Sequence, residues 1–518
     1  MKQIYTFLFF GIAVLFASCK KDKSNYDYKA NELITVNGIE SVYNVVSEKD
    51  KLVINPTITS SEEGAEFEYL WGIYETNVQG YAPVLDTIGR TKDLNYAIKQ
   101  PAKAWVLVYR VTNKKTKYSK YINVTVNVGT EFTRGWYVLK DDGTKSDLDL
   151  FLTPSSILPT EARENVYSLI NGQKLDGKAK IMNVFSSYKS TVTGTLANTK
   201  ALFVTTDKDV SAVNINTLKQ IRNMNSLFFS TPSPVAPNAA FCASSAYYLI
   251  NAGQMYNIGT NSSNTGLFGG RILRDAINTP YRLSDYYYTS TYSDACVFDE
   301  LSSTFLTLAN GGGSTLTTMS DVAGTAMPAA NNNKKPLFMG FKSATYIPAP
   351  VYAYTTIGFG IFQDKTNPAL KILTQMDLDK LKLKMTNDTL KTTDKIYNAT
   401  MHTLLDGDEN MIYFVVNNQV WSRNLSNKFE QLQFAPPAGE VVTFIRHKKY
   451  STTTEPAYSY NYVMIGTQSG TDYKVRMFTK SSGSLNSEPA FTLTGKGAVR
   501  DVMYMAPAIS EFNYSNTY

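Results

Sequence analysis

The chain has 518 residues, with 51 Lys and Arg against 44 Asp and Glu, so its formal net charge is +7 at neutral pH. This excess is small for the length and is scattered, apart from short clusters at 20–21 and 446–449. A surface that binds nucleic acid needs a denser basic stripe, so no nucleic-acid partner is expected. Only 18% of the residues are charged and 35 are Tyr, a composition typical of β-rich exported proteins because Tyr favours strands.

The first 18 residues have the pattern of an export signal. Lys2 is followed by an uncharged apolar run over 7–16, and small side chains at 17–18 precede Cys19. The apolar run is shorter than the roughly 20 residues that span a bilayer. We therefore predict a signal peptide over residues 1–18 and lipid attachment at Cys19. An ordinary secretory signal with a chance cysteine is the alternative.

The next segments are predicted to be a tether and a small β-sandwich. Residues 19–30 are polar and mostly charged, so they cannot bury apolar area and should form a flexible, lipidated tether. Residues 31–129 contain several short runs in which apolar and polar residues alternate, as half-buried strands require. The runs are 52–54, 67–71, 105–111 and 122–128. Their spacing, with a tryptophan on a central strand, indicates an Ig-like sandwich.

Residues 132–518 show a different pattern, in which apolar hairpins recur at irregular intervals. Turn residues separate the paired runs at 141–143, 417–418 and 469–470, and a last strand is expected over 498–505. Hairpins at the spacing of propeller blades predict a β-propeller-like domain of seven or eight blades. The fold class is therefore all-β, with a sandwich followed by a propeller. Separate β-sandwiches are the alternative for this region.

Two further features of this region concern a loop and the cysteines. Residues 310–335 are rich in Gly, Ser, Thr, Ala and Asn, so we expect a long surface loop there. Cys242 and Cys296 are the only cysteines after Cys19. In an exported protein they either form one disulfide or remain as two buried free thiols, and the sequence does not choose between these.

The sequence offers few groups for catalysis or for a cofactor. The two histidines are His402 and His447, too few for a His-rich zinc site, and His447 beside Arg446 and Lys448 is expected to be neutral and solvated. No nucleophile elbow, phosphate loop or dinucleotide fingerprint is present. Two groups of carboxylates are close in sequence: Asp141, Asp142, Asp147 and Asp149, and Asp406, Asp408 and Glu409. We expect hairpin tips there, with calcium binding as the alternative. No catalytic, metal or cofactor-binding residue is predicted.

Aromatic residues are the better indication of binding. Tyr286, Tyr287 and Tyr288 follow Arg282 in a loop-like stretch. Tyr offers a flat apolar face and one hydroxyl, which suits sugar rings or peptides. Three consecutive Tyr residues must point to both faces of any strand, so we expect at least one to line a groove. These four residues are the candidate ligand-binding residues; the alternative is that the Tyr side chains pack inside the blades.

Several motifs together resemble a known family. They are the signal ending at Cys19, Asn-Tyr-Asp-Tyr-Lys at 25–29, Asn-Gly-Ile at 37–39, Tyr-x-Trp at 69–71, Gly-Trp-Tyr-Val-Leu at 135–139 and Gly-x-Gly-x-Val-x-Asp at 495–501. This combination resembles the PKD-like surface lipoproteins of Bacteroidetes. The resemblance implies a PKD-like sandwich and display on the outer membrane, facing the cell exterior. It also implies an accessory role in nutrient-uptake systems of the starch-utilisation type, in which a TonB-dependent transporter works with a lid-like binding lipoprotein.

The sequence and the resemblance together predict a non-enzymatic surface lipoprotein. Its propeller is expected to bind a glycan or oligopeptide, to dock on the transporter complex, or both. A glycan- or peptide-degrading surface enzyme built on the propeller is the second hypothesis. A purely structural assembly subunit is the third, and the fold by itself does not choose among them.

Overall fold

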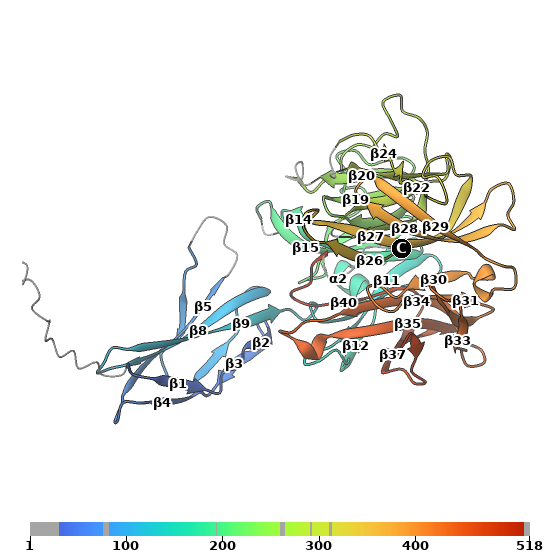
Figure 1. Ribbon diagram of the computed structural model, residues 1–518. Coiled ribbons are helices and arrows are strands. Elements are labelled where there is room, and N and C mark those ends of the chain that lie inside the picture. Colours follow the sequence, from blue (N-terminus) through green and yellow to red (C-terminus); the bar gives the residue numbers. More distant parts are fainter. Residues whose placement is uncertain are drawn as a thin grey trace, which may run out of the picture.

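The computed structural model describes residues 31–75, 82–192, 194–259, 265–290, 293–309 and 313–511. The predicted signal peptide and the whole predicted tether, Cys19 included, lie outside these residues. The described chain forms a small β-sandwich beside a much larger ring of β-sheets (Figure 1). Within these ranges, none of the helices has the length and hydropathy needed to cross a membrane.

The sandwich contains the four strands that the alternation predicted. Its main sheet consists of β2 (Val42–Val46), β9 (Ser119–Gly129), β8 (Lys103–Asn113), β5 (Phe67–Glu75) and β6 (Asp86–Gly89), in that order. Two short pairs accompany it: β1 (Ile34–Asn37) with β4 (Thr57–Ser60), and β3 (Lys51–Ile54) with β7 (Leu94–Ala97). Trp71 is fully buried at the centre and stacks on Tyr109, with ring centroids 3.9 Å apart. Its indole N–H donates to the Thr91 carbonyl at 3.1 Å, so the buried polar group is satisfied.

Seven sheets of three or more strands follow in the described residues between Gly135 and Met505, and they are the blades of a propeller. The first contains β40 (Ala498–Met505), β10 (Gly135–Asp141), β11 (Lys145–Leu152), β12 (Glu161–Arg163) and β13 (Leu175–Asp176), with helix α2 (Val166–Asn171) packed against β11. The second contains β14 (Ala179–Ser190), β15 (Ala197–Thr206), β16 (Val210–Asn214) and β17 (Gln220–Arg222). The third contains β18 (Pro237–Cys242), β19 (Ala246–Asn251) and β20 (Gln254–Gly259).

The remaining four blades have the same meander. The fourth contains β21 (Leu283–Ser290), β22 (Ser293–Asp299), β23 (Thr304–Thr307) and β24 (Thr317–Thr318). The fifth contains β26 (Lys334–Ile347), β27 (Ala353–Asp364), β28 (Lys371–Asp379), β29 (Lys382–Thr389) and β25 (Ser320–Asp321). The sixth contains β30 (Met401–Leu404), β31 (Met411–Val416), β32 (Gln419–Asn424) and β33 (Glu430–Phe434), preceded by the 3-10 turn η3 (Lys395–Asn398). The seventh contains β34 (Val441–Tyr450), β35 (Tyr460–Ser469), β36 (Asp472–Phe478) and β39 (Phe491–Lys496), with η4 (Pro456–Tyr458) and the pair β37 (Lys480–Ser481) and β38 (Ser484–Leu485).

Local sequence explains a typical hairpin. All six residues of β31 are buried, and the turn that follows consists of Asn417 and Asn418, which both have positive φ, 50° and 60°. Two residues of positive φ form the turn whose twist matches a tight hairpin, and Asn tolerates that conformation better than most residues. The strand therefore reverses at once, and Val416 pairs with Gln419.

The ring is closed by its two ends. The last strand, β40, pairs antiparallel with β10, so that Gly135 lies opposite Met505 and Trp136 opposite Tyr504. Trp136 is fully buried where the first and seventh blades meet, and its ring contacts Tyr460 and Tyr504 at centroid distances of 4.9 and 5.0 Å. The tyrosines around residue 460 are therefore part of the core.

The sandwich docks on the end of the ring where β34 and β40 finish. Glu455, in the loop after β34, accepts hydrogen bonds from Asn127 Nδ2 at 2.9 Å and from Arg134 Nη2 at 3.1 Å. Thr130 Oγ1 donates to the Asn216 carbonyl at 2.6 Å. The Arg134 guanidinium also lies over the Tyr458 ring, 4.0 Å from its centroid. These buried polar contacts fix how the linker enters the first blade.

The described part of 310–335 is mostly irregular and exposed, as expected of a surface loop, but it also contributes short strands and a few buried side chains. Residues 320–321 form β25, which pairs in parallel with β29. Met319, Met327 and Ala329 are buried in a core cluster shared by the fourth and fifth blades. Because the stretch as a whole is low in hydrophobicity, its sequence did not indicate that these few apolar side chains are buried. They pack in the cluster shared by the two blades.

Cys242 and Cys296 are both free and buried, so the disulfide alternative is wrong. Cys242 lies on β18 and Cys296 on β22, in two different hydrophobic clusters. Burial raises the pKa of the Cys296 thiol to about 12, and it also raises the pKa of Cys242. Buried thiols of this kind pack as small apolar side chains and have little reactivity.

Substitution of Trp136 by Ala should destabilise the propeller by about 3–5 kcal/mol, because it removes a large fully buried ring and leaves a cavity at the closure of the ring. Urea unfolding followed by far-UV circular dichroism measures the loss. Trp421→Ala is the matched control, since Trp421 is only partly buried and a smaller loss is expected. Equal losses for the two variants would contradict a special role for the closing contact.

Candidate functional site

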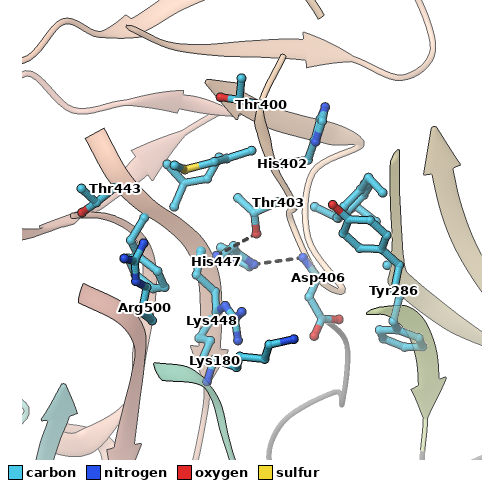
Figure 2. Close-up of a pocket in the computed structure, with 18 of the residues that line it drawn as sticks. Lys180, Tyr286, Thr400, His402, Thr403, Asp406, Thr443, His447, Lys448 and Arg500 are labelled. Carbon is cyan, nitrogen blue, oxygen red and sulfur yellow. Dashed lines mark hydrogen bonds between the residues drawn. The ribbon is translucent and has the colours of Figure 1, made fainter. Parts of the chain in front are cut away.

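A cavity of about 490 Å³ lies on the axis of the propeller (Figure 2). Its lining comes from the innermost strands of six blades, namely β14, β21, β26, β30, β34 and β40, together with adjoining loops. A second hollow adjoins it, shares five of its lining residues and adds the start of β18 from the remaining blade. Pockets of this size and position are typical of ligand sites in folds built around a central axis.

The cavity lies at the end of the ring that is remote from the sandwich. On β40, Arg500 near the start of the strand lines the cavity, whereas residues 507–511 follow its end. On β34, residues 443–449 line the cavity, whereas Glu455, after the end of the strand, contacts the sandwich. Along both β34 and β40, the chain thus leads from the cavity to the end that carries the sandwich.

Basic side chains predominate in the lining. Six are Lys or Arg (Lys178, Lys180, Arg446, Lys448, Lys449 and Arg500), against two acids, Asp207 and Asp406. Several of the cations pair with acids behind the wall. Arg446 Nη1 lies 3.0 Å from Asp501 Oδ1, and Arg500 Nε lies 2.7 Å from Asp141 Oδ2. Burial lowers the pKa of Lys448 to about 8, although the nearby Asp501 opposes this shift.

His447 is held by hydrogen bonds on both ring nitrogens. Nδ1 accepts the backbone N–H of Asp406 at 2.9 Å, so it carries no proton, and Nε2 lies 2.8 Å from Asn461 Oδ1, to which it donates. Burial lowers its pKa to about 4. The expectation of a neutral ring thus agrees with the structure, but the side chain is buried and not solvated. Its arrangement fixes the loop after β30 against β34, which is a structural role.

His402 has a different environment. Its ring packs against Phe338, with centroids 5.2 Å apart, and its Nε2 is buried without a hydrogen-bond partner among the described residues. Burial lowers its pKa to about 3, so the ring is neutral at physiological pH. Buried polar atoms in native proteins nearly always have partners, so an exception inside a cavity marks a place where a ligand or water can bind.

Of the three consecutive tyrosines, one lines the cavity. Tyr286 is half-buried in the lining, with its ring 6.3 Å from that of Phe338. Tyr287 and Tyr288 are fully buried on either side of the fourth blade: Tyr287 stacks on Phe241 at 4.0 Å, and Tyr288 packs in the cluster shared with the fifth blade. Tyr287 and Tyr288 therefore belong to the core.

Alternation along β21 places Tyr286 and Tyr288 on the face toward the fifth blade and Tyr287 on the opposite face. Tyr286, nearer the start of the strand, lines the cavity. Arg282, just before the strand, lines the second hollow. It is exposed, and its guanidinium lies 3.2 Å from Glu300. Ligand contact by Tyr286 and Arg282 stays a prediction.

The two groups of carboxylates are held by protein partners. Asp142 at the β10–β11 turn accepts the backbone N–H of Lys145 at 2.9 Å, which lowers its pKa, and this is the expected hairpin tip. Burial by itself would raise the pKa of Asp408, but hydrogen bonds, including those from Lys480 and Asn461, outweigh it and the pKa falls. Across the part of the chain that the structure describes, no three His, Cys, Asp or Glu side chains are grouped so that they could hold a metal ion.

Sequence reasoning missed most of the cationic lining. Lys180, Arg446 and Arg500 come from the second, seventh and first blades, and nothing in their local sequence shows that they meet. The one feature of the sequence that could have indicated a basic site was the cluster at 446–449. It is too short to stand out when the density of charge along the sequence is the only criterion.

Comparisons with known proteins give a family only for the first third of the chain. Residues 19–179 match the model of the PKD-like family. A search of curated proteins gives no match. The solved structures that are similar include a quinonprotein alcohol dehydrogenase-like protein from Bacteroides thetaiotaomicron, with 13% identity over 92% of this chain and 100% of that chain and a TM-score of 0.39. Another is a dihydro-heme d1 dehydrogenase, with 10% identity over 73% of this chain and 76% of that chain and a TM-score of 0.37. Neither likeness supports an argument about activity.

Acid should weaken the fold through its buried neutral histidines. The folded-state pKa of His447 lies below the unfolded value, so the stability it contributes is present above pH 6.5 and is lost as the pH falls toward about 4. Between pH 7.5 and 5.0 the loss from this residue is about 2 kcal/mol. The groups that face the His447 imidazole are the backbone N–H of Asp406 and the side chains of Asp408, Lys480, Lys449 and Asn461.

Urea unfolding at several pH values measures this effect. The variant His447→Gln cannot gain the proton, so its stability should be lower at pH 7.5 but should fall less between pH 7.5 and 5.0. An unchanged slope in the variant would mean that other groups carry the acid sensitivity.

Proposed function

We propose that this chain is a non-enzymatic surface lipoprotein of an outer-membrane nutrient-uptake system that includes a TonB-dependent transporter. Its propeller captures a glycan or an oligopeptide in the axial cavity and presents it to the transporter complex. The observation that carries this proposal is the axial cavity itself, with the Tyr286 ring in its wall, at the end of the ring remote from the sandwich. The lipid anchor and the outward orientation are part of the proposal.

The positions of the anchor and the cavity support each other. Cys19 and the predicted tether precede the sandwich in the sequence, and the sandwich docks on the far end of the ring from the cavity. An anchor at Cys19 would therefore hold the sandwich near the membrane and leave the mouth of the cavity facing away from it. A protein that captures nutrients from the medium needs this orientation.

The chemistry of the lining favours binding over catalysis. Glycoside hydrolysis requires two carboxylates facing the substrate, one of which is free to act as an acid. Asp207 and Asp406 are the two acids among the lining residues, and the Asp207 carboxylate accepts the backbone N–H of Lys178 at 2.8 Å. His447 has both nitrogens engaged, so it has no free site for proton transfer.

A second surface suits docking on the transporter. The β26–β27 hairpin extends from the cavity toward the end of the ring that carries the sandwich, and residues 343–356 at its tip contain no charged residue. Tyr346, Val351, Tyr352 and Tyr354 are exposed there, at 49, 59, 70 and 38%. Exposed aromatic side chains without charge are typical of protein contacts, so we assign this tip to the transporter complex.

Replacement of Tyr286 by Ala should weaken binding of the captured ligand about tenfold, because the ring supplies a flat contact face inside the cavity. Titration calorimetry of the full-length protein in detergent, against a panel of oligosaccharides and short peptides, provides the measurement. Tyr354→Ala, at the opposite end of the ring, is the control and should bind as the unmodified protein does. Equal affinity for both variants would rule out the axial cavity as the capture site.

The double variant Val351→Ser, Tyr352→Ser should lose the transporter in a gentle detergent pull-down from the native membrane, because it removes the apolar tip of the hairpin. Phe429→Ser is the matched control, since Phe429 is equally exposed on another blade, at 62%. Full recovery of the transporter with the double variant would exclude the hairpin as the docking surface. Loss of vesicle binding by the purified double variant would instead indicate that the tip contacts lipid.

A further inference from the structure

The axial cavity continues into the second hollow. This hollow has a volume of about 770 Å³, and part of its lining is formed by residues at the start of β18, β21 and β26 and just before β30. Each hollow by itself has the size of a site that encloses one small ligand, about 300–1,000 Å³. Five residues line both hollows: Lys180, Asp207, Tyr286, Thr400 and His402. Together the two hollows therefore offer room for a ligand of several linked units.

Tyr286 lies where the two hollows meet. Figure 2 shows Tyr286 and Arg500 on opposite sides of the axial cavity. The lining of the second hollow comes from the second to the sixth blades, so this hollow extends from the Tyr286 side. The Tyr286 side chain is half-buried, and an aromatic ring offers a flat apolar face. A chain that passes from one hollow to the other would contact this ring.

The polar groups of the second hollow are accessible to a ligand. Asp285 on β21 accepts a hydrogen bond from Asn238 Nδ2 on β18, and its Oδ2 lies 3.6 Å from Lys180 Nζ on β14. Arg282 Nε and Nη2 both lie 3.2 Å from Glu300 Oε2. The side chains of Asp285 and Arg282 are 47 and 60% exposed. The wall thus combines donors and acceptors from three blades, and a ligand can reach them.

This wall suits hydroxyl groups. A carboxylate offers about four acceptor sites and a guanidinium five N–H donors, more than the contacts of Asp285 and Arg282 with the protein use. One hydroxyl both donates and accepts, so hydroxyl groups of a sugar can bind an acid and a base of this wall together. Exposed ion pairs contribute little to stability, so sharing them with a ligand costs little. A peptide amide has its donor and acceptor on separate atoms, so the wall favours a glycan.

We propose that the axial cavity and the second hollow form one elongated site for an oligosaccharide. One end of the chain lies in the axial cavity, and a sugar ring packs on Tyr286 at the junction. The following units lie in the second hollow, where their hydroxyl groups bind Arg282, Asp285 and Asn238. This inference rests on the proposed function and narrows its ligand class to glycan chains long enough to occupy both hollows.

Titration calorimetry of the full-length protein in detergent, with probes of increasing length, tests this. The probes are malto-, cello-, xylo- and manno-oligosaccharides of two to seven units, and alanine peptides of two to seven residues. In at least one saccharide series the affinity should rise at least tenfold from two units to five, because the added units contact the second hollow. The affinity should then level off when both hollows are filled.

Variants locate the added units. Arg282→Ala should weaken binding of the five-unit probe about fivefold and leave the shortest probe that binds unchanged, because only the longer chain reaches the second hollow. Asp285→Asn, which keeps the size of the side chain, should reduce the gain with length in the same way. Arg90→Ala, at an exposed arginine of the sandwich, is the control and should change neither affinity. A smaller gain in either hollow variant supports the assignment; an unchanged gain in both, or equal weakening of short and long probes, would overturn it.

The remaining outcomes separate this inference from the proposed function. Saccharide affinity that does not depend on length, or a gain with length in the peptides only, would overturn the elongated glycan site while leaving capture in the axial cavity intact. Binding of no saccharide series, with a different ligand found in the wider panel that is sensitive to Tyr286→Ala, would do the same. Binding of nothing in the whole panel would overturn the proposed function itself.

Discussion

The pairing of β10 with β40 is the contact on which the rest of the propeller depends. These strands come from opposite ends of the domain, and their register places Trp136 opposite Tyr504 in a fully buried aromatic cluster. Without this pairing the first blade would lack its inner strand and the ring would remain open. A closed ring also leaves few strand edges exposed for pairing with other chains.

The same closure builds the floor of the axial cavity. Asp501 on β40 accepts the Met182 N–H of β14 and pairs with Arg446 of β34, so one carboxylate links three blades. A buried carboxylate that bonds to several partners fixes their positions, and its low exposure leaves its charge poorly screened by solvent. The geometry of the lining cations is therefore a consequence of how the ring is closed, and a change in blade number would separate them.

The inner strands β34 and β40 link the cavity to the end of the ring that carries the sandwich. Strands β34 and β40 line the cavity at one end and lead to Glu455 and to residues 507–511 at the other. Glu455 then holds the linker of the sandwich through Asn127 and Arg134, and the Arg134 side chain is almost entirely buried. These contacts fix the orientation of the cavity relative to the sandwich. An anchor placed before the sandwich would therefore also fix the direction in which the cavity faces.

The sequence by itself determined the strands and the order of the two parts. Alternation of apolar and polar residues at 67–71, 105–111 and 122–128 indicates strands with one buried face, and this is a local property of the sequence. Asn417-Asn418 indicates a tight turn because Asn tolerates positive φ. The same local signals recur from residue 135 onward, so a propeller of seven or eight blades could be predicted although its blades share little sequence.

Only the tertiary structure decided which side chains meet. Tyr286, Tyr287 and Tyr288 are identical in type, yet Tyr286 lines the cavity while the other two enter the core on either side of the blade. Lys180, Arg446 and Arg500 gather because three blades meet at the axis, a relation set by ring closure over hundreds of residues. Periodicity reports the burial of a residue but not the neighbours that the closed ring gives it, so the site could not be predicted from the sequence as the strands were.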